Sequence, residues 1–151
     1  MSRFTWSDTV IMAAAVADFR PTQPSTHKLK KRHRPVTHLD LTPTEDILQE
    51  LGTRRTTQFL VGFAAETEDL LAHAREKLHA KHVDLLVAND VSAAGSVFGS
   101  DTNRVVLLGA DGQAEEVPLL PKREVADRIL DRILALPTGR RTTKKPVRFH
   151  R

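Results

Sequence analysis

Acidic side chains follow three apolar runs of this sequence, at positions where they could bind one ligand together. Asp18 closes the first apolar segment, Glu66 follows the run at 59–61, and Asp90 follows the run at 85–88. If these runs are parallel strands, their carboxyl ends meet at one sheet edge, where open α/β sheets bind ligands. Carboxylates there could bind a metal ion or a sugar hydroxyl, although turn and cap roles are commoner.

A basic cluster lies between the first two runs. Most of the residues from 28 to 34 are cationic, namely Lys28, Lys30, Lys31, Arg32 and Arg34. Such a cluster is usually a solvated face. Beside an acidic sheet edge, however, a lysine-rich flap could also clamp a triphosphate, because the charge of a triphosphate needs several cations.

Two more lysines lie in a segment that is predicted to be an amphipathic helix. Its apolar stripe is Leu70, Leu71, Ala74 and Leu78. At 100° per residue, Lys81 falls about 35° from the centre of the stripe and Lys77 about 75°, whereas Glu76 and His79 point away. Two explanations exist for lysines at these positions. Their aliphatic stems could lie on apolar surface while the charged ends reach water, or an anion could be bound under the helix. Both lie near the helix end away from the expected ligand edge, so a second subunit or a folded-over flap would have to bring phosphate there.

The elements that position these side chains form an α/β pattern. The apolar runs at 59–61 and 85–88 flank the helix and predict a parallel β-α-β unit whose strands are covered on both faces. A third strand is expected within residues 8–19, with 10–12 as its buried part. Small residues at its end, among them Ala14 and Ala15, would let a ligand or a covering helix come close.

Two hairpins extend this core. Residues 27–32 and 36–41 alternate in polarity, which predicts a β-hairpin flap off the main sheet. Residues 104–109 and 116–120, joined by a turn at Asp111–Gly112, predict an antiparallel edge hairpin. The expected fold is therefore α/β and Rossmann-like, with three αβα layers and a mostly parallel sheet.

Two more helices complete the predicted fold. One begins near a cap at Thr42 or Thr44 and ends near Gly52. Acids in its first turn suit a base or ribose contact better than a phosphate. The last helix covers 122–136, with a core stripe of Val125, Ile129, Ile133 and Leu136.

Composition limits the class of protein. The 151 residues suit one domain, and 40% hydrophobic residues suffice for a core. Without cysteine there is no disulfide or thiolate metal site. No run reaches the roughly 18 apolar residues of a membrane span, and no secretory signal is seen, so a cytoplasmic protein is expected.

The positive charge is concentrated at one end. Residues 137–151 hold six Lys or Arg and no acid, and the rest of the chain has 17 bases against 19 acids. The formal charge of +4 therefore belongs to this tail, which is predicted to be disordered. Binding of nucleic acid through the tail is an alternative function, but the slight negative charge of residues 1–136 counts against it.

A nucleotide-binding doubly wound domain usually begins with a strand, a glycine-rich turn and a helix. This sequence has neither GxGxxG nor a Walker A motif, and the first strand of the predicted sheet has an uncovered edge. We therefore expect residues 1–136 to be the carboxy-terminal part of a larger domain. The missing fingerprint, and the lack of any Tyr for a Tyr-Lys pair, also disfavour a nicotinamide-dependent oxidoreductase.

Eight segments, taken in order, resemble phosphopantothenoylcysteine synthetase, the carboxy-terminal half of the bifunctional coenzyme A biosynthesis flavoprotein of bacteria. They are AAAVADF at 13–19, KLKK at 28–31, DIL at 46–48, VGFAAET at 61–67, REKLHAK at 75–81, DLLVANDVS at 84–92, FGSDTNRV at 98–105 and KREVADRILDRI at 122–133. The resemblance implies a CTP-dependent ligase that uses Mg²⁺, joins 4′-phosphopantothenate to cysteine through an acyl-cytidylate, and forms a homodimer. No flavin is expected in this chain.

The resemblance also implies roles for particular residues. Contacts to the nucleotide would come from Asp18, Glu45, Asp46, Ile47, Leu48, Phe63, Lys77 and Lys81. Lys28 would be the catalytic flap lysine that orients the phosphates, and Ala14 and Ala15 would line the pocket of the acyl intermediate. The ligands of the metal are left open.

The sequence departs from the family in two ways. Residues 44–47 read Thr-Glu-Asp-Ile where the family usually has Asn-Pro-Asp-Ile. The family's amino-terminal glycine-rich unit and its segment for phosphopantothenate binding and dimer contact are not in this sequence. Poor turnover by these residues alone is therefore expected, and a non-catalytic nucleotide-binding or dimerisation module is the alternative.

Overall fold

The computed structural model describes residues 3–28, 38–66, 69–90 and 100–136. The chain divides into two compact units, which are described separately. The larger consists of the chain up to Ala13 and from Leu48 onward, and the smaller is Ala14–Ile47. The basic tail and most of the lysine cluster predicted from the sequence lie outside the described residues.

A five-stranded sheet with the order β1-β4-β5-β6-β7 forms the centre of the larger unit. Its strands are β1 (Thr9–Met12), β4 (Phe59–Glu66), β5 (Leu85–Asp90), β6 (Thr102–Gly109) and β7 (Ala114–Pro121). The first three are parallel, and β6 and β7 are antiparallel to their neighbours. This arrangement confirms the predicted β-α-β unit and the antiparallel edge hairpin, and it places β1 at one end of the described sheet.

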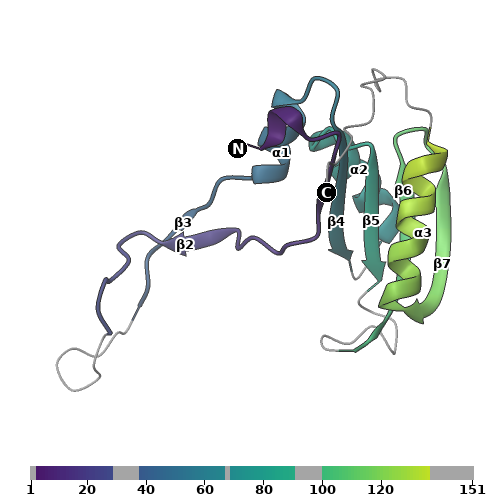
Figure 1. The fold of residues 1–151 in the computed structure, drawn as a ribbon. Coiled ribbons are helices and arrows are strands. Elements are labelled where there is room, and N and C mark those ends of the chain that lie inside the picture. The colour runs from purple at the N-terminus through teal and green to yellow at the C-terminus, as the bar shows by residue number, and fades with distance from the viewer. Residues whose placement is uncertain (1–2, 29–37, 67–68, 91–99, 137–151) are drawn as a thin grey trace, which may run out of the picture. The chain divides into compact units, whose positions relative to one another are not determined.

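Helices cover both faces of the sheet, which gives the predicted three layers (Figure 1). α1 (Ile47–Arg54) and α2 (Leu70–Ala80) lie on one face, and α3 (Lys122–Ala135) lies on the other. A short 3₁₀ helix (Phe4–Trp6) precedes β1. Side chains alternate between the faces along β4 and β5, as a pleated sheet requires. Even-numbered residues of β4 and β5 therefore face α1 and α2, and odd-numbered residues face α3.

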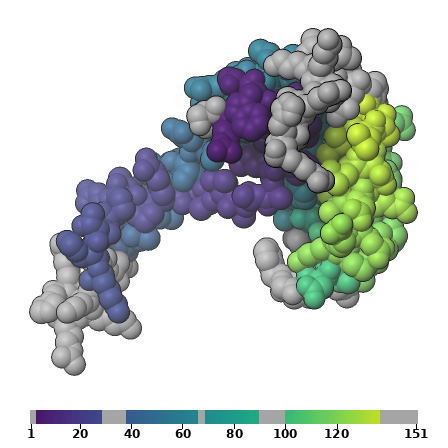
Figure 2. All heavy atoms as spheres, viewed as in Figure 1, coloured from purple at the N-terminus to yellow at the C-terminus, as the bar shows by residue number. Residues whose placement is uncertain are grey.

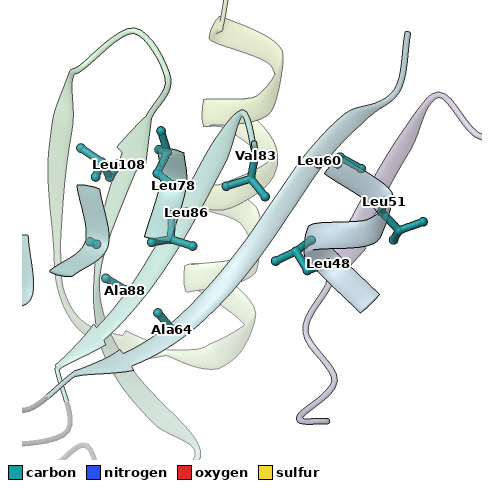
Figure 3. Close-up of a cluster of buried hydrophobic side chains, with 10 residues drawn as sticks. Leu48, Leu51, Leu60, Ala64, Leu78, Val83, Leu86, Ala88 and Leu108 are labelled. Carbon is teal, nitrogen blue, oxygen red and sulfur yellow. The ribbon is translucent and has the colours of Figure 1, made fainter. Parts of the chain in front are cut away.

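The core under α1 and α2 explains why the apolar runs are uninterrupted. Figure 3 shows Leu48 and Leu51 of α1 and Leu78 of α2 around the sheet residues Leu60 and Leu86. Complete burial of one such side chain contributes about 1.5–3 kcal/mol. On the other face of the sheet, the apolar stripe of α3 packs against β4–β7, as the periodicity predicted. The stripe consists of Val125, Ile129 and Ile133, together with Leu136 at the C-cap.

The hairpin between β6 and β7 turns where the sequence indicated. Gly112 has a φ of +80°, and its N–H donates a hydrogen bond of 3.0 Å to the carbonyl of Gly109. Only glycine adopts such a φ without cost. In β7, Pro118 lies near a register shift between β6 and β7, which suits an edge strand because proline cannot donate to a ladder.

The smaller unit contains a two-stranded antiparallel sheet, with β2 (Phe19–Pro21) paired to β3 (Leu41–Pro43). A hairpin off the main sheet is thus confirmed, but apart from Leu41 its described strands lie outside the predicted segments 27–32 and 36–41. Residues 29–37 lie outside the described residues, and residues 27–28 and 38–40 are not strand. The prediction is therefore wrong for residues 27–28 and 38–40, and it stays untested for residues 29–37.

Three other predictions about local structure were wrong. β1 ends at Met12, so Asp18 does not close that strand. Neither Thr42 nor Thr44 caps α1, because Thr42 lies in β3 and the helix begins only at Ile47. Leu71 is 40% exposed and is not part of the core, because α2 packs on the sheet chiefly through Ala74 and Leu78. Within the described ranges, no helix is both long and apolar enough to cross a bilayer.

Candidate active site

The carboxyl edge of the parallel strands is formed as predicted for two of the three acids. Glu66 ends β4, Asp90 ends β5, and these two residues are paired in register. The other parallel strand, β1, stops earlier, with Met12 opposite Gly62 of β4. Asp18 belongs to the smaller unit instead. Among the described residues, the edge is therefore built by β4 and β5.

Within the smaller unit, the base of the hairpin brings Asp18 close to the segment after β3. The N–H of Thr44 donates a 2.9 Å hydrogen bond to the carbonyl of Asp18, which extends the β2-β3 ladder by one position. Glu45 and Asp46 follow directly, and the side chains of Asp18, Glu45 and Asp46 are exposed. The predicted cytidine contacts from these two stretches of sequence are thus neighbours in space.

Three other predicted site residues also belong to the smaller unit. Ala14 and Ala15 are exposed and lie in the segment between β1 and β2. Lys28 is exposed and follows a local turn in which the hydroxyl of Ser25 donates to the carbonyl of His27 at 2.8 Å. Lys28 is seven residues beyond β2, so backbone pairing with β3 does not fix it.

In the larger unit, the sheet separates Phe63 from the two helix lysines. Phe63 is half-buried and packs against the core under α3. Lys77 lies in the last turn of α2, and Lys81 is the C-cap residue of that helix, on the opposite face. Leu48 is buried with 7% exposure, so its side chain is part of the core and only its backbone is available to a ligand. Ile47 begins α1 and is partly exposed.

The positions of Lys77 and Lys81 agree with the helical-wheel prediction. Both are half-buried, whereas Glu76 and His79 are exposed. A cation near a helix C-terminus is stabilised by the negative end of the helix dipole, so these lysines have a structural role in addition to any ligand contact. The backbone of Lys81 is held tightly, because a Cβ placed on Gly52 of α1 would lie 2.1 Å from the carbonyl oxygen of Lys81.

Sequence reasoning missed an ion pair that connects the starts of two central strands. Asp84 precedes β5, and its carboxylate accepts a hydrogen bond from the guanidinium of Arg55. The same oxygen, Oδ2, accepts a second hydrogen bond of 2.8 Å from the N–H of Leu60 in β4. The only signal in the sequence was an acid placed directly before the run at 85–88. The pair lies at the amino ends of the strands, away from the ligand edge.

Metal-binding residues are not preassembled in the parts of the chain that the structure describes. There, no three His, Asp or Glu side chains are grouped to hold a metal ion.

Comparison with known proteins decides the family. Residues 1–136 match the model of the DNA/pantothenate metabolism flavoprotein C-terminal domain. The chain belongs to this family. The resemblance drawn from the sequence motifs is thereby confirmed, and so is the fold that it implied.

Individual relatives support the assignment to the flavoprotein C-terminal domain family. The chain is 49% identical over 144 residues to the coenzyme A biosynthesis bifunctional protein CoaBC of Bacillus subtilis (strain 168), covering 94% of this chain and 35% of that protein. A crystal structure of the C-terminal domain of a CoaBC protein superimposes with a TM-score of 0.68 at 36% identity, covering 87% of this chain and 56% of that one.

A third match shows the fold alone. It is a mutant of Cab2 in complex with phosphopantothenate-cysteine, with a TM-score of 0.59, 22% identity, and coverage of 82% of this chain and 42% of the other. The chain thus spans about a third of the length of the Bacillus relative and about half of the structural ones. The activity of those complete proteins is therefore considered below as a proposal.

Proposed function

We propose that this chain provides the nucleotide-handling part of a phosphopantothenate–cysteine ligase in coenzyme A biosynthesis. The observation that carries the proposal is the 49% identity over 144 residues to a bifunctional coenzyme A biosynthesis protein. The proposed reaction has two steps. A carboxylate oxygen of 4′-phosphopantothenate attacks the α-phosphorus of CTP and displaces pyrophosphate. The amine of cysteine then attacks the acyl carbon, CMP leaves, and the amine loses a proton.

The chain has cationic residues that could offset the negative charge of the two substrates in the first step. A triphosphate and a phosphorylated acid repel each other, so cations must be positioned to offset the charge of both. Lys28, Lys77 and Lys81 are the proposed cations, with Lys28 as the catalytic flap residue. Asp18, with Glu45 and Asp46 beside it, would contact the cytidine, while Phe63 would add a further contact. Ala14 and Ala15 would leave room for the acyl intermediate.

The fold supports these roles in part and adds a requirement. Lys77 and Lys81 lie on the α2 face at the amino end of the parallel strands, whereas the usual ligand edge is at the carboxyl end. Because β4 spans eight residues and a strand rises about 3.3 Å per residue, the two edges are about 25 Å apart. One triphosphate cannot span that distance. We therefore propose a homodimer in which lysines of one copy serve nucleotide bound to the other.

Mg²⁺ would accompany CTP, and a cytoplasmic location follows from this role. When bound, the metal would neutralise phosphate charge and orient the leaving pyrophosphate. No flavin is proposed for these residues. Because the glycine-rich unit of the family is not in this sequence, the 151 residues by themselves are expected to turn over poorly.

The test combines a binding and a turnover measurement. Calorimetric titration with CTP and Mg²⁺ should show saturable binding, and release of pyrophosphate should require phosphopantothenate. Binding without any release would favour the alternative of a non-catalytic nucleotide-binding or dimerisation module. If CTP did not bind, both the ligase function and the alternative of a non-catalytic module would be wrong. Rapid synthesis of phosphopantothenoylcysteine would refute the expected slow turnover.

A further inference from the structure

A groove with a volume of about 790 Å³ lies beside the amino-terminal half of α2, over β6 and β7. Its size is in the range of about 300–1,000 Å³ that is typical of small-molecule sites. The groove lies within the larger unit, and all residues that line it are described by the structure. None of the residues assigned above to CTP or phosphopantothenate lines it.

The groove exists because α2 leaves part of the sheet uncovered. The core on the α2 face draws its residues from β4, β5 and β6, but among the described residues no member comes from β7. The buried side chains of β7, Val117 and half-buried Leu120, face α3 instead. Within the described ranges, no helix packs a core residue against the other face of β7.

The floor of the groove can be assigned from register and pleat. Val106 packs against the core on the α2 face, and Arg104 lies two residues earlier, so both side chains share that face. Glu116 is the partner of Val106 in β7 and therefore also lies on this face. Pro118 completes the lining on β7.

The opposite wall comes from α2. Leu71 and Arg75 are four residues apart and so lie on the same side of the helix. Leu71 is 40% exposed, which is unusual for a leucine in the apolar stripe of its helix. The groove explains this exposure, because Leu71 forms an apolar wall beside an open space.

Two guanidinium groups therefore border an apolar groove from different elements, Arg75 from α2 and Arg104 from β6. In the described part of the chain, neither takes part in an ion pair. A guanidinium offers five directional donors that match the oxygens of carboxylate, sulfate or phosphate groups. Leu71, Val106 and Pro118 provide apolar surface for the rest of a ligand.

Two acids, Asp69 and Glu116, also line the groove. Asp69 is the N-cap residue of α2, where the positive end of the helix dipole offsets part of its charge. Glu116 lies in the middle of a strand and has no such compensation. It is therefore the residue that should oppose an anionic ligand.

We propose that this groove binds an amphipathic organic anion, with the acidic group between Arg75 and Arg104 and the apolar part along Leu71, Val106 and Pro118. None of the residues proposed for the ligase reaction lines the groove, and the proposal does not depend on that reaction. Because the arginines are exposed, water and salt screen them, and binding should weaken at high ionic strength.

The probe for the test is octyl sulfate, used below the concentration at which it forms micelles, and octyl glucoside is the uncharged control. Titration of the whole chain, followed through backbone amide chemical shifts, should place octyl sulfate at the start of α2 and on β6–β7. Octyl glucoside should bind about tenfold more weakly, because it lacks the charge-assisted hydrogen bonds.

Substitutions with opposite expected signs make the test specific. Arg75→Gln and Arg104→Gln should each weaken binding about three- to tenfold, whereas Glu116→Gln should strengthen it about twofold. Arg123→Gln on α3, across the sheet, is the matched control and should have no effect. Equal binding of the two probes, shifts spread over both faces, absence of octyl sulfate binding, or unchanged affinity in both arginine variants would each overturn the proposal.

Discussion

The carboxylate of Asp84 accepts a hydrogen bond of 2.8 Å from the N–H of Leu60, and it also binds the guanidinium of Arg55. The N–H of Asp84 in turn donates a 2.9 Å hydrogen bond to the carbonyl of Leu60. One residue thus joins the starts of β4 and β5 through its backbone and its side chain. Arg55 follows α1, so the same carboxylate also ties that helix to the sheet.

Asp84→Asn should lower the free energy of unfolding substantially. The Arg55 side chain is only 10% exposed, so removal of its partner leaves a cation with little access to water. We expect a loss of about 2–4 kcal/mol in urea-induced unfolding. The control is Glu50→Gln, which breaks the exposed pair with Arg54 and should cost less than about 1 kcal/mol. Equal losses in the two variants would show that Asp84 does not have this role.

Gly52→Ala should destabilise the larger unit even though alanine favours helix. The added Cβ would lie 2.1 Å from the backbone oxygen of Lys81, which cannot rotate away. Forced repacking of this kind costs about 1–3 kcal/mol, more than the gain of about 1 kcal/mol in helix propensity. Thermal unfolding should therefore occur at lower temperature.

The neighbouring Thr53→Ala is the control for that variant, because Thr53 is exposed and its hydroxyl donates to the Gln49 carbonyl within the same helix. Its melting temperature should be almost unchanged. If Gly52→Ala were as stable as the parent chain, α1 and the end of α2 would not be in close contact. Because Gly52→Ala also displaces Lys81, it should weaken CTP binding as well.

Asp111→Asn should loosen the attachment of α3 to the β6–β7 turn. The Arg132 side chain is 16% exposed, and one of its nitrogens lies 3.1 Å and 3.0 Å from the two carboxylate oxygens of Asp111. An asparagine keeps the turn bond to the N–H of Gln113 but loses the charge. We expect a loss of about 1–2 kcal/mol.

Arg132→Met serves as the comparison, because it removes the cation together with its buried Nε, which has no hydrogen-bond partner among the described residues. It should cost less than Asp111→Asn. Hydrogen exchange of α3 amides would report the difference locally. Faster exchange in Arg132→Met than in Asp111→Asn would contradict this explanation.

Removal of residues 137–151 tests the alternative of nucleic-acid binding. The segment carries six of the 23 Lys and Arg residues and no acid. Any affinity of the chain for duplex DNA should fall steeply with salt and should disappear in the truncated chain. CTP binding should be unaffected. DNA binding that survives truncation would place a basic surface elsewhere on the chain.

The sequence predicted the core of the fold better than its connections. Runs such as 85–88 are uninterrupted because both faces of the sheet are covered, so a strand was the natural reading. The stripe of α3 was equally clear. The end of β1 was missed because the alanines at 13–15 suit strand and loop alike. The strands at the base of the hairpin were missed, because the β2-β3 ladder contains two prolines, which weaken any strand signal.

The candidate site shows a different limit. Its residues could be named from motifs, but the face of the sheet that each would occupy depends on long-range packing. Phe63 lies two residues after Val61 in β4, so both side chains face α3. Nothing near Phe63 in the sequence reveals which helix covers that face. Leu71 matched the helical stripe but lies beyond the part of the sheet that α2 covers. The groove beside it is formed by strands more than thirty residues away in the sequence.

The central claim is that Lys28, Lys77 and Lys81 bind the phosphates of one nucleotide, and calorimetric titration with CTP and Mg²⁺ tests it most directly. Lys28→Ala, Lys77→Ala and Lys81→Ala should each raise the dissociation constant about tenfold, because each removes one charge-assisted contact. Arg123→Ala, which removes a cation from the exposed face of α3 (Figure 2), should bind CTP like the parent chain. The same affinity in the parent chain and in all three lysine variants would contradict the claim.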